Sequence, residues 1–208
     1  MPSETHRRQR RIEIAEATWR VIERAGPTGA SMREIAREAG YTTGVLSHHF
    51  RDKHELVTFA FELAIERSTA RAIAASQDAG LVDGLAALLP LDQERRRLAT
   101  LWMVTLAASR GETAQAAQMQ RHYRQAQQAL LAVLHQAVGA GSEQESAELV
   151  EELLVVVDGI TVNALTDPDS YPPDRQVALL QRAARRRGLE PDQGTDRTPL
   201  RPGTSRSR

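Results

Sequence analysis

Apolar residues recur at helical spacing along almost the whole chain, and this pattern constrains the fold more than any other feature. Ile12, Ala15, Trp19 and Ile22 follow one another at steps of three and four, which places them on one face of a helix. No segment of useful length alternates apolar and polar residues as a half-buried strand does. We therefore expect an all-α protein with about nine helices.

Composition excludes several classes of protein. The 208 residues are 41% hydrophobic and 26% charged, which is ordinary for a globular chain. Cysteine is absent, so there is no disulfide framework, thiolate metal site or cysteine nucleophile. The longest apolar run, Ala129 to Leu134, is far shorter than the ~20 residues that span a bilayer, and the basic start has no apolar segment behind it. We expect a soluble, cytoplasmic protein with no membrane partner.

Helix start and stop signals divide the first part of the chain into short helices. Gly26–Gly29 ends the first helix, and Gly40 ends the second. Ser31 followed by Glu34 is a capping-box pattern, in which the hydroxyl and the carboxylate bond to the first free amides of the second helix. The third helix, to about His49, and a long fourth helix have capping residues of the same kind: Thr42 or Thr43, and Asp52.

Further helices are expected over residues 81–89, 92–109, 112–138, 143–165 and 173–187, separated by proline and glycine. Beyond Gly188 the chain consists largely of Pro, Gly, Ser, Thr and Arg. Such a segment buries too little surface to offset its ordering entropy, so a disordered basic tail is predicted over 189–208.

Charge is balanced overall but not along the chain. Lys and Arg number 27, as do Asp and Glu, yet the front and the tail are more basic than the middle. This asymmetry favours an anionic partner for the front end alone. A solvated charge pattern without function is the alternative.

The segment Ser31–Lys53 carries the functional information. Two short helices joined by a glycine-containing turn form a helix-turn-helix unit, whose second helix lies in the major groove of DNA. At the start of that second helix stand Thr42, Thr43, Gly44 and Val45, small residues that allow close approach and hydroxyls that bond to phosphate or base edges. A plain helical hairpin, in which the threonine only caps, is the alternative that spacing leaves open.

Residues 8–56 resemble the DNA-binding domain of the TetR family of bacterial transcriptional regulators. The resemblance lies in AREAGYTTGVLSHHF and the following DKHEL. PLDQERRR and VVDGITVNAL are more weakly similar to the C-terminal domain of the betaine-regulator type. The resemblance implies a DNA-binding domain over 1–56, a ligand-binding and dimerisation domain over 57–188, and a homodimeric repressor of a palindromic operator that a small-molecule effector releases.

The resemblance also implies which residues touch DNA: Arg33, Thr42, Thr43, Gly44, Val45, Ser47, His48, His49 and Lys53. In it, Leu46 and Phe50 match buried positions, whereas His49 and Lys53 match phosphate contacts. One departure is that many members have aromatic residues where this chain has Ser47 and His48, so the operator preference of tyrosine-bearing relatives does not transfer.

Candidate effector-binding residues lie on the later helices: Trp102, Met103, Leu106, Met119, Tyr123, Asp158 and Thr161. Asp158 stands inside an apolar run, where an unpaired charge is costly, so it either pairs across the bundle or dimer or faces a ligand. With only 4% aromatic residues a cage of several rings is hard to build, so we expect a mainly apolar effector. Core packing is the ordinary alternative for each of these apolar side chains.

Two apolar stripes on the last long helices need partner surfaces, either in a second subunit or within the chain: Leu149, Leu153, Val156, Val157, Ile160 and Ala164, and Val177, Leu180 and Ala184.

Other function classes find less support. His48, His49 and His54 are close in sequence but lack the spacing of a metal site, and no phosphate-binding glycine loop or nucleophile elbow is present. We expect no cofactor, no metal and no enzyme activity. The runner-up is a helical small-molecule carrier with an inactive DNA-binding region.

Overall fold

The computed structural model describes residues 4–108 and 143–189, together with scattered positions between 117 and 134. Its helices are α1 (Glu4–Gly29), α2 (Met32–Ala39), α3 (Thr43–His49), α4 (Lys53–Ala79), α5 (Leu81–Ala86), α6 (Gln93–Ala108), α8 (Glu143–Thr166) and α9 (Pro173–Arg185). The scattered positions are helical as well, and no strand occurs in the described part of the chain. The prediction of an all-α fold is confirmed.

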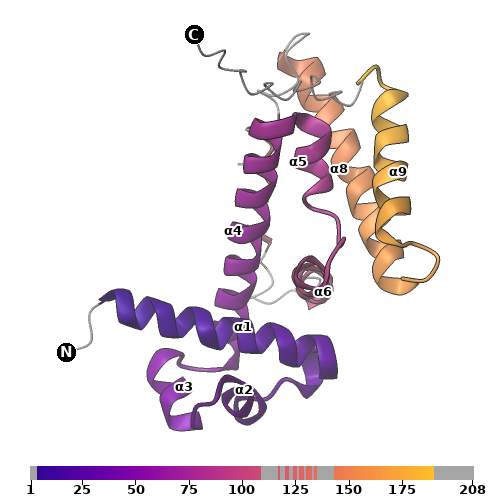
Figure 1. The fold of residues 1–208 in the computed structure, drawn as a ribbon. Coiled ribbons are helices and arrows are strands. Elements are labelled where there is room, and N and C mark those ends of the chain that lie inside the picture. The colour runs from indigo at the N-terminus through magenta and orange to yellow at the C-terminus, as the bar shows by residue number, and fades with distance from the viewer. Residues whose placement is uncertain are drawn as a thin grey trace, which may run out of the picture.

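Helices α1, α2 and α3 form a head at one end of α4, and α5, α8 and α9 gather at the other end (Figure 1). α1 crosses the foot of α4, with α2 and α3 beneath it (Figure 1). The core of the head is apolar and closed to water, with Ile14, Ile35, Leu46 and Leu56 all at 0% exposure. Because burial of each such side chain contributes about 1.5–3 kcal/mol, these residues hold the three short helices on α4.

Glycines end the first two helices in different ways. Gly40 adopts a left-handed conformation with φ of 73°, and its N–H donates to the carbonyls of Ala36 and Arg37, which closes α2. Gly26 has φ of 67° and interrupts α1, but helical structure resumes and reaches Gly29. The predicted end of the first helix is therefore a kink followed by one more turn.

Side-chain caps begin the next three helices, as predicted. The hydroxyls of Ser31 and Thr42 accept from the N–H groups of Glu34 (3.1 Å) and Val45 (3.4 Å). Asp52 accepts from the N–H of Glu55 at 2.8 Å, and this bond lowers the pKa of the Asp52 carboxyl. These bonds satisfy amides that have no partner within the helix.

The reciprocal half of the predicted capping box is not formed. The N–H of Ser31 donates to the carbonyl of Gly29, and the carboxylate of Glu34 instead accepts from Arg37 and from Arg24 on α1. Arg37 is the main reason that the pKa of Glu34 lies below its usual value. Glu34 therefore ties α2 to α1 rather than capping its own helix.

α4 connects the two ends of the molecule. Leu56, Ala60 and Phe61 of α4 belong to the core of the head, whereas Ala72 belongs to a second core with α5, α8 and α9. Leu98 of α6 also packs into the core of the head. The predicted boundary at residues 56 and 57 lies inside α4, and the division into two domains there stays a prediction.

Most of the predicted helix over 112–138 and all but Leu189 of the predicted tail lie outside the described residues. Leu189 is partly buried against the second core. Within the part of the chain that the structure describes, no helix is both long and apolar enough to cross a membrane.

Candidate nucleic-acid interface and interior pocket

α3 presents a small, polar surface to solvent. Thr43, Gly44, Ser47 and His48 are exposed, and Val45 is half-buried. The opposite side of α3 is anchored, because Leu46 is fully buried. The hydroxyl of Ser47 donates to the carbonyl of Thr43 at 3.0 Å. The exposed side of α3 therefore carries no bulky side chain at its start. Another molecule can approach the backbone closely there.

The start of α3 and the exposed side of α2 form one continuous surface. Arg33 is exposed on α2, and together with Thr43 and Tyr41 it lines a depression between the two helices. Arg33 and Thr43, which the sequence analysis named separately, are thus brought together. Tyr41 donates to Glu13 of α1 at 2.7 Å, which fixes the turn between α2 and α3.

Charged side chains brace α2 against α1. Arg20 and Arg24 of α1 both contact the carboxylate of Glu38, at 2.7 and 3.1 Å. These two contacts lower the pKa of Glu38, so its charge persists at neutral pH. The network fixes the angle at which the helix-turn-helix unit is held by α1.

His49 is less accessible than its predicted phosphate contact requires. Its side chain is only 7% exposed, and its Nδ1 is buried with no hydrogen-bond partner among the described residues. Burial, followed by the charges of His48, Arg7, Arg10 and Arg11, lowers the pKa of His49. A neutral ring packed inside the head stabilises the end of α3 more than it attracts a phosphate.

Lys53 is the first residue of α4 and is half-buried, directly after the cap Asp52.

His48 and His49 have ring centroids 5.4 Å apart in an edge-on arrangement. Across the described residues, no group of three or more histidine and carboxylate side chains is arranged to hold a metal ion.

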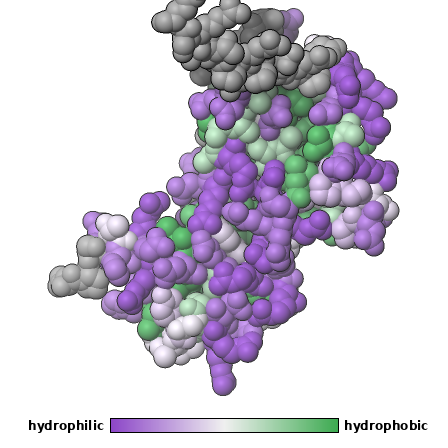
Figure 2. Space-filling model, viewed as in Figure 1, coloured by the Kyte–Doolittle hydropathy of each residue, from purple (hydrophilic) through white to green (hydrophobic). Residues whose placement is uncertain are grey.

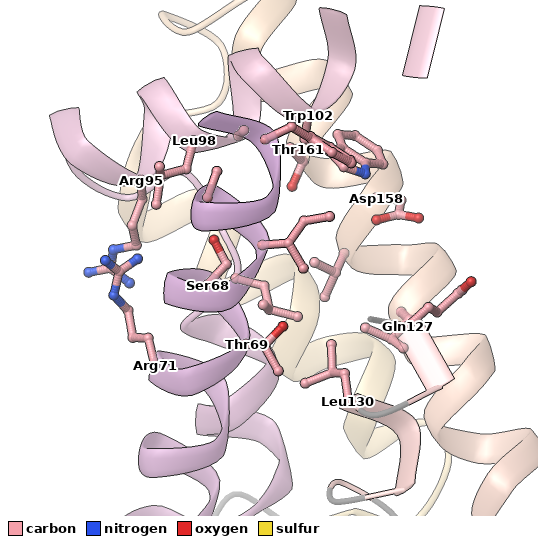
Figure 3. A pocket seen from close by; sticks show the side chains of 17 residues that line it. Ser68, Thr69, Arg71, Arg95, Leu98, Trp102, Gln127, Leu130, Asp158 and Thr161 are labelled. Carbon is pink, nitrogen blue, oxygen red and sulfur yellow. The ribbon is translucent and has the colours of Figure 1, made fainter. Parts of the chain in front are cut away.

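A pocket of about 140 Å³ lies between α4, α6 and α8. Its walls are mostly apolar, with Phe61, Ile65, Leu98, Trp102 and Val157 among them. Charged side chains lie at both ends of the pocket, and the hydroxyls of Ser68 and Thr69 lie between them (Figure 3). Arg71 and Arg95 lie at one end, and Trp102, Asp158 and Gln127 lie at the other (Figure 3).

Asp158 is the unusual polar group of the pocket. Burial raises the pKa of its carboxyl to about 6. Within the described part of the chain the carboxylate makes no hydrogen bond and no ion pair, and Figure 3 shows it near Trp102. Of the two alternatives for Asp158, pairing within the bundle finds no partner among the described residues, and pairing across a dimer stays a prediction. The group is positioned to contact whatever enters the pocket.

Arg71 and Arg95, in contrast, are partnered. Arg71 pairs with Glu94 at 3.3 Å, and Arg95 pairs with Asp92 at 2.7 Å. Their charges are compensated before any ligand arrives. Among the described residues that line the pocket, the charge without a partner is thus negative and lies at the Asp158 end.

Three of the predicted effector-binding residues line the pocket: Trp102, Asp158 and Thr161. Met103 is half-buried but is not part of the lining. Met119, Tyr123 and the side chain of Leu106 lie outside the described residues.

The contribution of α4 to the pocket was not predicted from the sequence; four of its residues line the pocket: Phe61, Ile65, Ser68 and Thr69. Their spacing of three and four residues was a usable signal, but it does not distinguish a pocket wall from a core.

The apolar stripes expected to seek a partner surface are largely used inside the chain. Leu153, Val157, Ile160 and Ala164 of α8 and Leu180 and Ala184 of α9 are all buried within the single chain. A different side of α8 is open, where Val155 and Val162 are 66% and 40% exposed and Gly159 lies between them with open space around it. On this view the head is mostly hydrophilic, and broader apolar areas lie above it (Figure 2).

Two family descriptions match this chain. Residues 14–58 match "Bacterial regulatory proteins, tetR family", and residues 77–188 match "BetI-type transcriptional repressor, C-terminal". Among curated proteins, the chain is 32% identical over 180 residues to the HTH-type transcriptional regulator PksA of Bacillus subtilis, covering 84% of this chain and 88% of the relative. It is 26% identical over 189 residues to the HTH-type transcriptional regulator BetI of Vibrio campbellii, covering 82% and 88%.

Solved structures show the same arrangement of helices. A transcriptional regulator from Rhodococcus sp. Rha1 matches with a TM-score of 0.71 and 29% identity, covering 83% of this chain and 92% of that one. A regulator from Saccharomonospora viridis in complex with choline matches with a TM-score of 0.70 and 21% identity, covering 86% and 96%. The second likeness is one of fold.

Proposed function

Because the chain belongs to the TetR family of bacterial transcriptional regulators, we propose that it is a homodimeric, cytoplasmic repressor that a small-molecule effector releases from a palindromic operator. Each subunit offers one α3 to the major groove, and the two half-sites are about one helical turn apart, ~34–36 Å, or more widely spaced. The contacts proposed for α2 and α3 are those of Arg33, Thr43, Gly44 and Ser47.

The observation that carries this proposal is the continuity of α4. Its first residue, Lys53, follows directly on the helix-turn-helix unit, and residues 61–71 of the same helix line the pocket. A ligand that displaces the middle of α4 therefore changes where the head is held. An effector that prefers the displaced arrangement shifts the population away from the DNA-binding one, with a coupling free energy of roughly 1–3 kcal/mol.

The pocket favours a mainly apolar effector that carries one positive charge. Asp158 supplies an uncompensated carboxylate, and the indole of Trp102 at the same end of the pocket supplies a face for a cation–π contact. The similar regulator from Saccharomonospora viridis holds choline, an organic cation. Here the same class of ligand would place its cationic group beside Asp158 and its apolar part against α4 and α6.

Dimerisation is assigned to the open side of α8. Val155, Gly159 and Val162 stand three or four residues apart and share a face, and Gly159 allows a second helix to approach closely. Burying this face against its copy removes the most exposed large apolar side chains of the described residues from water.

Selection of binding sites from random duplex DNA by the purified full chain tests the proposal, with footprinting at ~0.15 M salt, where non-specific attraction is damped. An inverted repeat is expected. Thr43→Ala should weaken binding to it about tenfold or more, while Lys53→Ala should weaken binding equally for all sequences. Recovery of no motif would instead support the small-molecule carrier.

A further inference from the structure

The first turns of α1 extend beyond the packed head. All residues from Glu4 to Arg10 are exposed, and the first fully buried side chain of α1 is Ile14. Four arginines lie in or next to this extension: Arg7, Arg8, Arg10 and Arg11. Their contacts separate them into two pairs, one that forms ion pairs within the chain and one that forms none among the described residues.

Arg8 and Arg11 make contacts within the chain. Arg8 pairs with Glu66 of α4 at 3.6 Å. Arg11 donates to the main-chain carbonyl of His49 at 2.9 Å, pairs with Glu55 at 3.3 Å, and lies 4.3 Å above the ring of Phe50. Arg11 thereby fixes the start of α1 against the end of α3.

Arg7 and Arg10 make no ion pair and no hydrogen bond within the part of the chain that the structure describes. They are three residues apart and so share one face of α1. That face lies on the side of α3, because Arg11, four residues after Arg7, bonds to the main-chain carbonyl of His49, and Glu13, three residues after Arg10, accepts from Tyr41 just before α3. Figure 1 shows α3 beneath the N-terminal half of α1.

The acidic residues nearest to these two arginines on α1 form no ion pair with them in the described part of the chain. Glu4 lies three residues before Arg7 and Glu13 three residues after Arg10, and Glu13 accepts from two uncharged donors, Tyr41 at 2.7 Å and Gln9 at 3.4 Å. The end of α3 carries the negative pole of a helix, and of its two imidazoles His48 is exposed whereas His49 is nearly enclosed. A phosphate next to the end of α3 would therefore find in Arg7 and Arg10 two full positive charges that no ion pair among the described residues occupies.

We propose that Arg7 and Arg10 bind the DNA backbone phosphates that flank the segment read by α3, so that the DNA contact surface includes the first turns of α1. This inference rests on the proposed function, since it requires DNA on α3. Guanidinium groups bind phosphate oxygens through paired N–H donors, and such contacts position a protein on the duplex without reading its sequence.

The experiment compares full-length dimers with Arg7→Gln, Arg10→Gln or both changes on the selected operator, from 0.05 to 0.3 M salt. Each single change should lower the slope of log affinity against log salt by about one, and the double change by about two. The affinity for operator and for an unrelated duplex should fall by the same factor. Arg7→Lys and Arg10→Lys should restore the slope, because they keep the charge.

Arg8→Gln is the matched control, since it removes an exposed arginine one residue away that pairs with Glu66. It should leave the slope unchanged. A double variant with the slope of the wild type would overturn the inference while leaving the proposed function intact. If the wild-type protein bound operator and unrelated duplex equally well, both this inference and the proposed function would be overturned. Equal thermal unfolding curves for all variants would exclude a change in fold as the cause.

Discussion

The head and the pocket region satisfy their polar groups to very different degrees. In the head, the caps Ser31, Thr42 and Asp52 have their amide partners, and Glu38 is held by two arginines. At the far end of the pocket, Asp158 has no partner among the described residues. The head is thus preformed for a rigid partner, whereas the pocket region contains a buried carboxylate that a cationic ligand can pair with.

This difference indicates in which region of the molecule a ligand can shift the conformational equilibrium most. A ligand stabilises a protein in proportion to its preference for one arrangement over another. In the head the caps and the ion pairs between helices are formed, and only the Nδ1 of His49 is buried without a partner among its described residues. The head therefore gains little from rearrangement and moves as a unit. A pocket with an uncompensated carboxylate gains most when a cation enters, and α4 transmits the change because it belongs to both cores.

The largest expected effect is on the stability of the head. Phe50 ends α3, is 1% exposed and packs its ring 5.6 Å from that of Phe59. Phe50→Ala should lower the free energy of unfolding by about 3–5 kcal/mol, because it removes a large buried ring and leaves a cavity. Urea denaturation measures the loss, and operator affinity should fall with it. Gln77→Ala, at an exposed position of α4, is the control; a loss for Phe50→Ala as small as that of the control would show that the head is not tightly packed.

The second prediction concerns the uncompensated carboxylate. Asp158→Asn should raise the stability of the ligand-free protein at pH 7.5 by roughly 1–3 kcal/mol, because a neutral amide costs less to bury than a charge. The same change should weaken binding of choline tenfold or more. Urea denaturation and tryptophan fluorescence titration measure the two effects. A destabilised variant would mean that Asp158 has a favourable partner in the free protein.

The pH dependence of stability follows from the same group. The pKa of Asp158 is raised from its ordinary 3.8 to about 6 in the folded protein. The folded state therefore holds a proton more tightly than the unfolded state does. The resulting stabilisation is fully present below pH 3.8 and is lost as the pH rises through 6. The difference in unfolding free energy between wild type and Asp158→Asn should accordingly grow from pH 4.5 to pH 7.5; a constant difference would contradict the assignment.

Cation binding should follow the ionised form of Asp158. The affinity for choline should fall about tenfold between pH 7.5 and pH 5, because protonation removes the charge that attracts the ligand. The uncharged analogue 3,3-dimethyl-1-butanol, which has the same shape, should bind with no such dependence. Isothermal titration at several pH values measures both ligands. Parallel profiles for the two would show that Asp158 does not contact the cation.

The smallest effect is expected at a single cap. Ser31→Ala should destabilise the protein by about 1 kcal/mol, because the N–H of Glu34 loses its acceptor. Ser31→Asn, which keeps an acceptor, should remain close to the wild type. Thermal denaturation distinguishes the two. Equal losses for both variants would show that the hydroxyl contributes through packing rather than through the cap.

The helices and their starts were predictable because the signals for them are local. The caps at Ser31, Thr42 and Asp52 lie where the sequence places them, and α8 begins at Glu143 as expected. The second half of the capping box failed, since Glu34 is held by Arg37 on its own helix and by Arg24 on α1. No local pattern reports a competitor ten residues away on another helix.

By itself, the sequence determined the helical class, the helix-turn-helix unit and its family, because these depend on short-range spacing. Only the tertiary structure decided which apolar stripes stay inside the chain, which arginines keep their charge uncompensated, and that Asp158 faces a pocket. Helical periodicity tells which residues share a face, but it does not tell what lies opposite that face. Burial and charge pairing depend on that opposite surface, which comes from distant parts of the chain.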